Sequence, residues 1–215
     1  MKPLLLGHRG ARASRHIPEN TLASFELCLQ HGCDGFEFDV RRSADGQAVV
    51  CHDPVVRGME IAQTPAGALA LPSLSKVLRS FGGRAFLDIE LKVAGLEGEA
   101  AALLRTHPPQ NGYVVSSFFP EVLAAIHEAD AAISLGLLCD NREQLKVWQE
   151  LPVAWVIPQF KLADRELAER VHQAGKKVMV WTVNDAEEMR RFAAWGVDGI
   201  ISDQTELLSR TLHAR

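Results

Sequence analysis

The chain alternates between short β-type runs and amphipathic helical stretches almost from end to end, and this alternation constrains its fold more than any other feature. The candidate strands span residues 4–6, 35–40, 85–91, 113–117, 134–139, 155–158, 177–182 and 199–202. Between them, apolar residues recur every three or four positions, which predicts helices over residues 21–30, 96–105, 120–129, 142–149, 165–174 and 186–195. Strands that alternate with helices are typical of a parallel sheet with helical crossovers.

Capping signals support several of these helices. Asn20 and Asp164 are candidate N-caps, and Gly32, Gly175 and Gly196 stand where helices are expected to end. Eight strand–helix units in a chain of 215 residues predict a compact α/β fold, a (β/α)8 TIM barrel, whose active site lies at the carboxyl ends of the strands. An open doubly wound sheet is the alternative, but residues 7–10 lack the third glycine of a dinucleotide-binding loop.

The length and the 47% hydrophobic content suit one domain or a small two-domain protein, and we favour one. With the alternation of strands and helices, this predicts a single catalytic barrel domain over residues 1–215. Residues 54–72 are the least regular stretch and are rich in Ala, Gly and Pro. We interpret this stretch as a short loop excursion between barrel elements and not as a second domain.

Composition excludes several classes of protein. The net charge is −4 and Lys and Arg form no dense run, which argues against nucleic acid as a partner. No run of about 18 apolar residues occurs, so no membrane span is expected, and residues 3–7 are too short for the core of a signal peptide. Cys28, Cys33, Cys51 and Cys139 lack the paired spacing of a zinc site or a disulfide framework, which predicts reduced thiols and a cytoplasmic protein.

Charged residues stand at the ends of the apolar strands, where an unpaired charge is costly. Successive side chains of a strand point to opposite faces, so Glu37 and Asp39 share one face of their strand, and Glu90 and Lys92 share one face of another. In a barrel, these polar side chains would point into the mouth. Three carboxylates, Glu37, Asp39 and Glu90, would repel one another there unless a cation neutralised them.

Oxygen-only ligands favour a hard ion, so the expected cofactor is one divalent metal ion, Mg²⁺ or Ca²⁺. The alternative is that the acids are surface residues at strand ends or pair with Arg41, Arg42 and Lys92. Arg9 and Lys92 add a guanidinium fork and an ammonium group that can bind an anion such as phosphate, or can form salt bridges with the acids.

His8 and His52 each follow a strand-like run. Histidine titrates close to neutral pH, so both are candidates for the acid and the base of a reaction beside the metal. The other six histidines lie in loops or helices away from this group, and we interpret them as structural or solvated.

These residues lie in motifs that resemble the glycerophosphodiester phosphodiesterase family. The motifs are His8-Arg9-Gly10, Pro18-Glu19-Asn20-Thr21, Glu37-Phe38-Asp39-Val40, His52-Asp53-Pro54, Glu90-Leu91-Lys92, residues 180–184 and residues 196–203, in the order of the family. The resemblance covers nearly the whole chain. It implies a (β/α)8 barrel and metal-dependent hydrolysis of glycerophosphodiesters to glycerol 3-phosphate and an alcohol.

The resemblance also implies residue roles. It makes Glu37, Asp39 and Glu90 metal ligands, His8 and His52 the general acid and base, and Arg9 and Lys92 phosphate contacts. Glu19, Asn20 and Asp53 match supporting positions, and Trp181 is expected to line the mouth or, alternatively, to be a core residue of the seventh strand. The chain departs from the family after His52-Asp53, where only residues 55–71 replace a larger insertion that helps to cover the substrate, so the alcohol group stays open.

An attack by the glycerol hydroxyl next to the phosphate, through a cyclic phosphate, fits the absence of an evident protein nucleophile among the motifs. Two other functions stay open: a lysophospholipase D-like phosphodiesterase of the same superfamily, and a catalytically inactive phosphate-binding protein. The expected partner is a small-molecule glycerophosphodiester, and formation of a homo-oligomer is left open.

Overall fold

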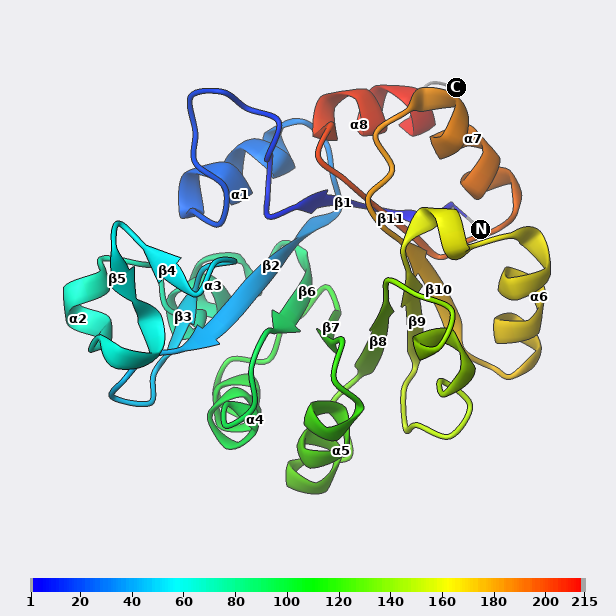
Figure 1. Cartoon of the computed structure of the whole chain (residues 1–215). Helices are drawn as coiled ribbons and strands as arrows, with labels where there is room; N and C mark the ends of the chain where they lie inside the picture. Colours follow the sequence, from blue (N-terminus) through cyan, green and yellow to red (C-terminus); the bar gives the residue numbers. More distant parts are fainter. Residues whose placement is uncertain (1, 214–215) are drawn as a thin grey trace.

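The computed structural model describes residues 2–213, and its eight parallel strands close into a barrel (Figure 1). Around the barrel these strands are β1 (Leu4–His8), β2 (Gly35–Arg42), β6 (Phe86–Leu91), β7 (Tyr113–Ser117), β8 (Leu135–Cys139), β9 (Trp155–Pro158), β10 (Lys177–Val180) and β11 (Gly199–Ser202). Strand β1 pairs with β2 on one side and with β11 on the other, which closes the sheet. The predicted (β/α)8 barrel is confirmed, and the open sheet is excluded.

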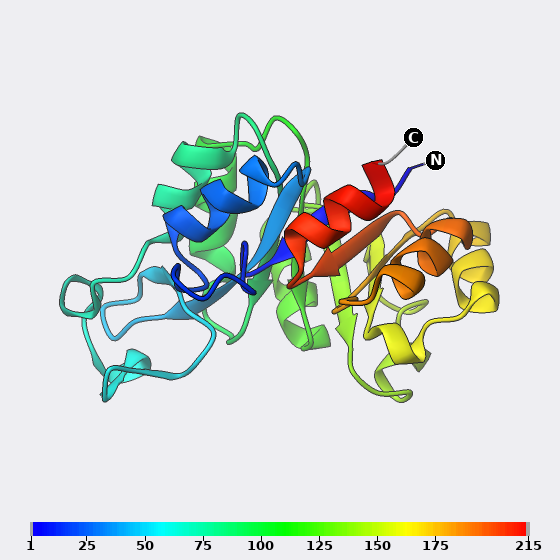
Figure 2. The same ribbon diagram turned by 90° about the horizontal axis from the view of Figure 1, so that it is seen from above.

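Helices cover the outer face of the barrel (Figure 2). They are α1 (Leu22–Gln30), α3 (Leu74–Phe81), α4 (Glu97–Thr106), α5 (Pro120–Ala129), α6 (Arg165–Gln173), α7 (Ala186–Ala194) and α8 (Thr205–His213). None of the helices within residues 2–213 is long and apolar enough to cross a membrane.

The predicted N-cap at Asp164 is confirmed, because its carboxylate accepts a hydrogen bond from the Leu167 amide at 2.7 Å. The predicted N-cap at Asn20 is wrong. Thr21 caps α1 by accepting a hydrogen bond from the Ser24 amide, whereas the Asn20 side chain turns into the barrel. Gly32, Gly175 and Gly196 follow the ends of α1, α6 and α7 with positive φ, as the sequence predicted.

The predicted helix at 142–149 is also wrong, since this segment contains only the 3₁₀ turn η2 (Gln144–Lys146). The side chain of Asn141 accepts hydrogen bonds from the amides of Glu143 and Gln144, both at 3.0 Å. An Asn side chain that bonds to nearby amides competes with helical hydrogen bonding. The amphipathic pattern nevertheless serves packing, because Trp148 is buried in the core.

Apolar side chains lie on both faces of the sheet, because successive side chains of each strand point to opposite faces. Phe36 and Phe38 point outward toward the helices, and Phe36 stacks on Phe25 of α1 with ring centroids 4.2 Å apart. Glu37 and Asp39, at the alternate positions, therefore point into the barrel. Gly35 allows β2 and β6 to approach closely here, because a Cβ atom at this position would lie 1.9 Å from the Phe86 carbonyl oxygen.

Residues 48–72 form a lobe at one edge of the molecule (Figures 1 and 2). Strand β3 (Ala48–Val50) pairs antiparallel with β2, and the segment continues through β4 (Val55–Val56), β5 (Met59–Glu60), the 3₁₀ turn η1 (Ile61–Gln63) and α2 (Ala66–Leu69). Val49, Ile61 and Leu69 form a small hydrophobic cluster of their own within this lobe. The stretch at 54–72 thus holds short regular elements stabilised by local packing.

Candidate active site

Three acidic side chains meet at the carboxyl ends of two neighbouring strands. Glu37 and Asp39 come from β2 and Glu90 from β6, where the strand register places Asp39 beside Glu90. One carboxylate oxygen from each residue lies within 4.8 Å of those of the other two. All three are buried, and Glu37 Oε1 has no hydrogen-bond partner among the described residues.

The three carboxylates are not equivalent electrostatically. Burial raises the pKa of Glu37 well above its usual value, and repulsion from Asp39 and Glu90 raises it further. Burial, with repulsion from Asp39, raises the pKa of Glu90 to about 7. Burial would also raise the pKa of Asp39, but Lys92 and Arg9 outweigh it and hold that pKa below its usual value. The cluster therefore needs more positive charge before all three carboxylates are ionised together.

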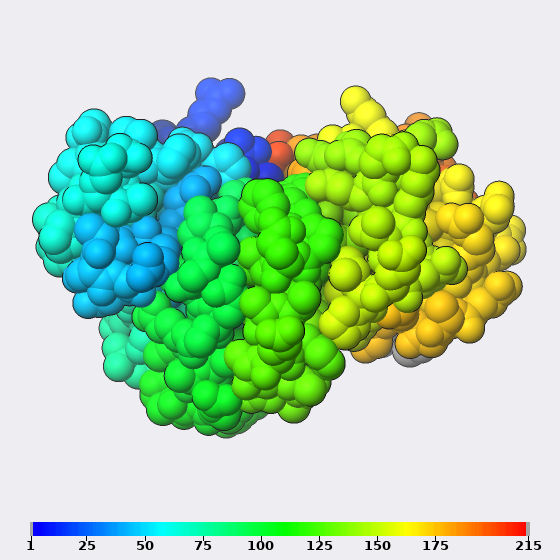
Figure 3. Space-filling model, turned by 60° about the horizontal axis from the view of Figure 1, so that its bottom comes forward, coloured from blue at the N-terminus to red at the C-terminus, as the bar shows by residue number. Residues whose placement is uncertain are grey.

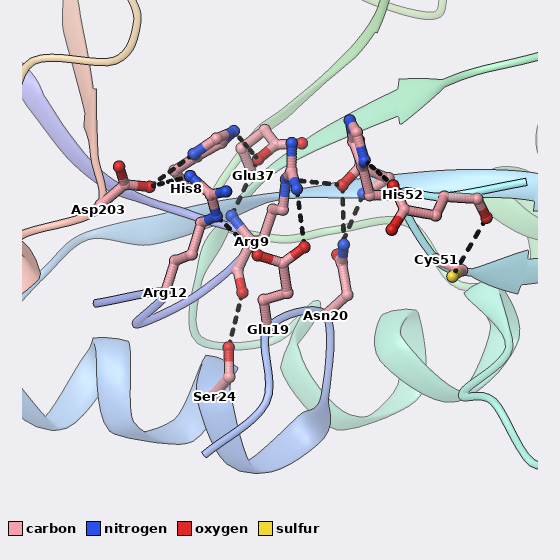
Figure 4. A network of polar contacts seen from close by, with 12 residues as sticks. His8, Arg9, Arg12, Glu19, Asn20, Ser24, Glu37, Cys51, His52 and Asp203 are labelled. Atoms are coloured by element: carbon pink, nitrogen blue, oxygen red, sulfur yellow. Dashed lines mark hydrogen bonds and ion pairs between the residues drawn. The ribbon is translucent and has the colours of Figure 1, made fainter. Parts of the chain in front are cut away.

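Two cations border the acids. Lys92 Nζ lies 2.7 Å from Glu90 Oε1 and 3.3 Å from Asp39 Oδ1. Arg9 Nε lies 3.2 Å from Asp39 Oδ2. Arg9 Nη1 donates to Glu19 Oε1 at 2.7 Å (Figure 4). The sequence left open that Lys92 pairs with the acids, and the structure shows this pairing with Asp39 and Glu90.

His8 ends β1 and faces the acids. Its Nδ1 lies 2.7 Å from Asp203 Oδ1, and its Nε2 lies 3.9 Å from Glu37 Oε2 (Figure 4). Asp203 follows β11, and it also accepts hydrogen bonds from Arg12 at 3.2 Å and from Asn184 at 2.7 Å. The bond at Nδ1 fixes the ring so that Nε2 points toward the mouth.

Asp203 ends the motif at residues 196–203, but sequence reasoning assigned it no role in the site. The signal was present, because Asp203 directly follows an apolar strand, as Lys92 does. Burial would raise the pKa of Asp203, but the hydrogen bond and charge of His8, together with Asn184 and Arg12, outweigh it and hold that pKa well below its usual range. Since the folded pKa is depressed, Asp203 contributes stability above about pH 4 that is lost as the pH falls.

His52 follows β3 and approaches the mouth from the lobe. Its Nδ1 lies 2.7 Å from Asp53 Oδ1, and its carbonyl oxygen accepts a hydrogen bond from Arg41 Nε at 2.7 Å. Both histidines thus carry an aspartate at Nδ1. Arg41 holds the backbone of His52 and is not paired with the three acids.

Asn20 and Glu19 support the cluster from the loop before α1. Asn20 Nδ2 donates to Asp39 Oδ2 at 2.8 Å, and the residue adopts a left-handed conformation with φ of 57°. Glu19 joins two cations, because its oxygens accept from Arg9 at 2.7 Å and from Arg12 at 2.6 Å. Sequence reasoning missed Arg12.

A second buried acid that sequence reasoning left unassigned lies inside the barrel below the cluster. Asp88 of β6 is fully buried, and its Oδ1 accepts a hydrogen bond from Ser116 at 2.6 Å. Burial raises the pKa of Asp88 to about 7. Its negative charge adds to the field that acts on Glu37 and Glu90.

Glu37, Glu90 and the two cations open into a cavity of about 110 Å³, the mouth cavity. Its lining comprises His8, Arg9, Glu37, His52, Glu90, Lys92, Phe118, Leu138, Trp181 and Ile201. Trp181 lines this cavity and also packs edge-on against Phe118, with centroids 5.6 Å apart, while its Nε1 donates to the Ile157 carbonyl at 2.9 Å. One wall of the mouth cavity is therefore charged and the other apolar.

The fold and this charge arrangement define a barrel enzyme that acts on an anion at the carboxyl ends of its strands. The model of the glycerophosphoryl diester phosphodiesterase family matches residues 8–97 and 99–207. The chain belongs to this family, which confirms the family and the phosphodiesterase class expected from the motifs.

Known proteins agree with this assignment. The chain is 29% identical over 238 residues to a glycerophosphodiester phosphodiesterase from Caldanaerobacter subterraneus, with 97% of each chain covered. A phosphodiesterase from Oleispira antarctica, solved in complex with the product sn-glycerol-3-phosphate, is 26% identical with a TM-score of 0.86, and the match covers 99% of this chain and 98% of that one. A glycerophosphodiester phosphodiesterase from Thermotoga maritima, at 24% identity, shares the fold with a TM-score of 0.84 and 98% coverage of both chains.

Proposed function

We propose that this chain hydrolyses glycerophosphodiesters to glycerol 3-phosphate and an alcohol, with one divalent metal ion and with His8 and His52 as general acid and base. The observation that carries the proposal is that both histidines border the same cavity as Glu37, Glu90 and the two cations, Arg9 and Lys92. The glycerol phosphate bound by the Oleispira antarctica relative supports the same product class.

The donor set suits a hard divalent ion. Glu37, Asp39 and Glu90 offer only oxygen atoms, which favours Mg²⁺ or Ca²⁺ over zinc. Glu37 Oε1 is buried without a hydrogen-bond partner in the described chain, and such an atom is costly unless a cation or a donor meets it. When bound, a divalent ion supplies charge neutralisation for the phosphoryl oxygens.

Arg9 and Lys92 would hold the phosphate of the substrate. Both are largely buried, so their charges act in a medium of low dielectric, where attraction to a phosphate is stronger than in water. Their contacts to Asp39 and Glu90 fix the positions of the guanidinium and ammonium groups before the substrate arrives. Such preorganised charge stabilises an anionic transition state at little cost in reorganisation.

The two histidines would move the protons. One histidine removes the proton of the glycerol hydroxyl next to the phosphate, and that oxygen forms a bond to phosphorus. The bond from phosphorus to the alcohol oxygen breaks, and the other histidine donates a proton to that oxygen. The product of this step is a cyclic glycerophosphate, which water opens to glycerol 3-phosphate with the roles of the histidines reversed.

Asp203 acts as a positioning residue for His8 in this proposal. We expect Asp203→Asn to lower kcat by about 10- to 100-fold with little change in KM, because an amide can hold the ring in the wrong tautomer. The pH profile of kcat should shift as well, which a merely structural defect would not cause. Asp198→Asn is the matched control, since Asp198 pairs with His172 at the opposite end of β11. An equal loss in both variants would contradict the positioning role.

The expected location is cytoplasmic, and this stays a proposal. All four cysteines are free, and Cys28, Cys33 and Cys139 are buried. Burial raises the pKa of Cys139 to about 12, which keeps this thiol protonated and unreactive at neutral pH.

The experiment that tests the proposed function measures release of glycerol 3-phosphate from glycerophosphocholine and glycerophosphoethanolamine. The purified protein is incubated with Mg²⁺, with Ca²⁺ or with a chelator. We expect release with at least one of the two ions and a loss of at least about 100-fold in chelator, because the phosphate then meets uncompensated carboxylates. Equal release in chelator would overturn the metal site, and no release with either ion would overturn the activity.

A further inference from the structure

A second cavity, of about 450 Å³, adjoins the mouth cavity, and we call it the side cavity. It is enclosed by the loop before α1, by the end of β3 and by the lobe, which Figure 3 shows in light blue and cyan at one edge of the surface. Its lining comprises Pro18, Glu19, Asn20, Thr21, Val50, Cys51, His52, Asp53, Val56, Arg57, Ala70, Leu71 and Pro72. Among residues 2–213, His52 alone lines both the mouth cavity and the side cavity.

The mouth cavity is small for a complete diester. At about 110 Å³ it lies well below the range of roughly 300–1,000 Å³ that is typical of small-molecule sites. The side cavity is within this range, and the two meet at His52. A substrate with its phosphate beside Arg9 and Lys92 therefore has room for its larger group on the far side of His52.

The walls of the side cavity are mainly apolar. Cys51, Val56 and Leu71 pack against the hydrophobic cluster of the lobe but stay partly exposed. Pro18 and Pro72 also line this space. An apolar group that entered it would bury these side chains and gain hydrophobic free energy.

The polar side chains from the α1 loop are already engaged. Both oxygens of Glu19 accept hydrogen bonds, one from Arg9 and one from Arg12. The amide group of Asn20 donates to Asp39. These groups have little capacity left to bind a charged or hydroxylated ligand in the side cavity.

The polar side chains from the lobe are engaged in the same way. Asp53 pairs with His52. The Asp53 side chain is 73% exposed, so water and salt screen the charge of its carboxylate. The Arg57 guanidinium donates to the Leu69 carbonyl. None of the described lining residues is Phe, Tyr or Trp, so the aromatic surfaces that bind quaternary ammonium groups are lacking among them.

Two residues of the wall have positive φ for local reasons, since Arg57 lies in the two-residue turn between β4 and β5 and Ala70 is the left-handed C-cap of α2. Arg57 has φ of 48° and Ala70 has φ of 50°, in the left-handed region that non-glycine residues rarely adopt. The hydrogen bond from Arg57 to Leu69 ties these two parts of the wall together. The hairpin turn and the helix cap thus fix the course of the backbone at this wall.

We infer that the side cavity receives the alcohol portion of the diester and that this portion has an uncharged, apolar body. The inference rests on the proposed function. It places His52 between the two halves of the substrate, next to the oxygen that leaves with the alcohol. The chain would then prefer alkyl diesters of glycerol phosphate to diesters with a charged head group.

The test compares kcat/KM for the methyl, butyl and hexyl diesters of glycerol phosphate and for glycerophosphocholine, with Mg²⁺ or Ca²⁺ present. We expect a rise of roughly 50-fold from methyl to butyl, because three further methylenes are buried. Glycerophosphocholine should be slower than the butyl diester. A flat series, or a preference for glycerophosphocholine, would overturn the inference while leaving the proposed function intact. Hydrolysis of none of the diesters would overturn both.

Variants locate the effect. Leu71→Asn and Val56→Thr place polar groups in the wall, and each should reduce the butyl-to-methyl ratio to about twofold or less while the methyl diester is still hydrolysed. The matched control is Val55→Thr, because Val55 is exposed and lies next to Val56 without lining the cavity. A ratio that changes equally in the control, or in none of the variants, would contradict the assignment.

A second readout does not depend on turnover. Cys51 is the one partly exposed cysteine, and it lines the side cavity. We expect hexyl phosphate to slow the alkylation of Cys51 by iodoacetamide several-fold, whereas inorganic phosphate alone should not. Equal protection by both ligands, or protection by neither, would overturn the inference.

Discussion

Replacing His8 with alanine is expected to lower the release of glycerol 3-phosphate by about 1,000-fold and to leave the barrel folded. A positioned acid or base contributes about 10²- to 10⁴-fold to such a rate. The ring of His8 is fixed by Asp203 at 2.7 Å, so its Nε2 is aimed at the mouth cavity before the substrate binds. The measurement is kcat at saturating glycerophosphodiester and metal ion, with circular dichroism as the check on folding.

His172→Ala is the matched control for this variant. The His172 ring is also paired with an aspartate, at 2.8 Å from Asp198, but this pair lies at the amino end of β11, away from the acids. We expect kcat of this control to stay within about twofold of the unaltered protein. A similar loss in both variants would show that the effect of His8 comes from lost stability and not from proton transfer.

Replacing Glu37 with glutamine is expected to change function and stability in opposite directions. Affinity for Mg²⁺ or Ca²⁺ and metal-dependent turnover should each fall by at least about 100-fold, because the site loses one of its three charged ligands. The metal-free protein should become more stable by about 1–3 kcal/mol, because a neutral amide no longer repels Asp39 and Glu90. The oxygen that accepts the Arg9 amide hydrogen bond is retained in glutamine.

Calorimetric titration of the metal ion and urea unfolding in chelator measure the two effects separately. Glu206→Gln is a suitable control, since Glu206 is exposed in the first turn of α8 and far from the acids in the sequence. This control should change neither metal affinity nor stability by a measurable amount. If Glu37→Gln is less stable than the unaltered protein in chelator, and the unaltered protein binds neither Mg²⁺ nor Ca²⁺, then Glu37 has a structural role and is not a metal ligand.

The sequence alone determined the barrel and the place of the acids, and the reason is local. Successive side chains of a strand point to opposite faces, so Glu37 and Asp39 lie on the face opposite Phe36 and Phe38. This alternation does not depend on the rest of the chain. Parallel strands joined by helices bring their carboxyl ends to one side, so the polar residue that follows each strand meets the others there. His8 and Lys92 could be placed at the mouth by this rule.

The same rule also places Asp203 at the mouth, but local pattern could not determine which side chains pair with one another there. The pair of His8 and Asp203 joins residues 195 positions apart in the sequence, and it exists because β1 pairs with β11 when the sheet closes. Asn20 looks like a helix cap in sequence, yet the closed barrel offers it the buried carboxylate of Asp39, and the Thr21 hydroxyl serves α1 instead.

The side cavity likewise exists only in three dimensions. Its walls come from the loop before α1 and from the lobe, which share no sequence pattern. Hydrophobic periodicity reports which face of an element is buried, but it carries no information on how distant loops enclose a space. Tertiary packing therefore decided the shape of the cavity beside His52, and with it the part of the substrate that this chain can select.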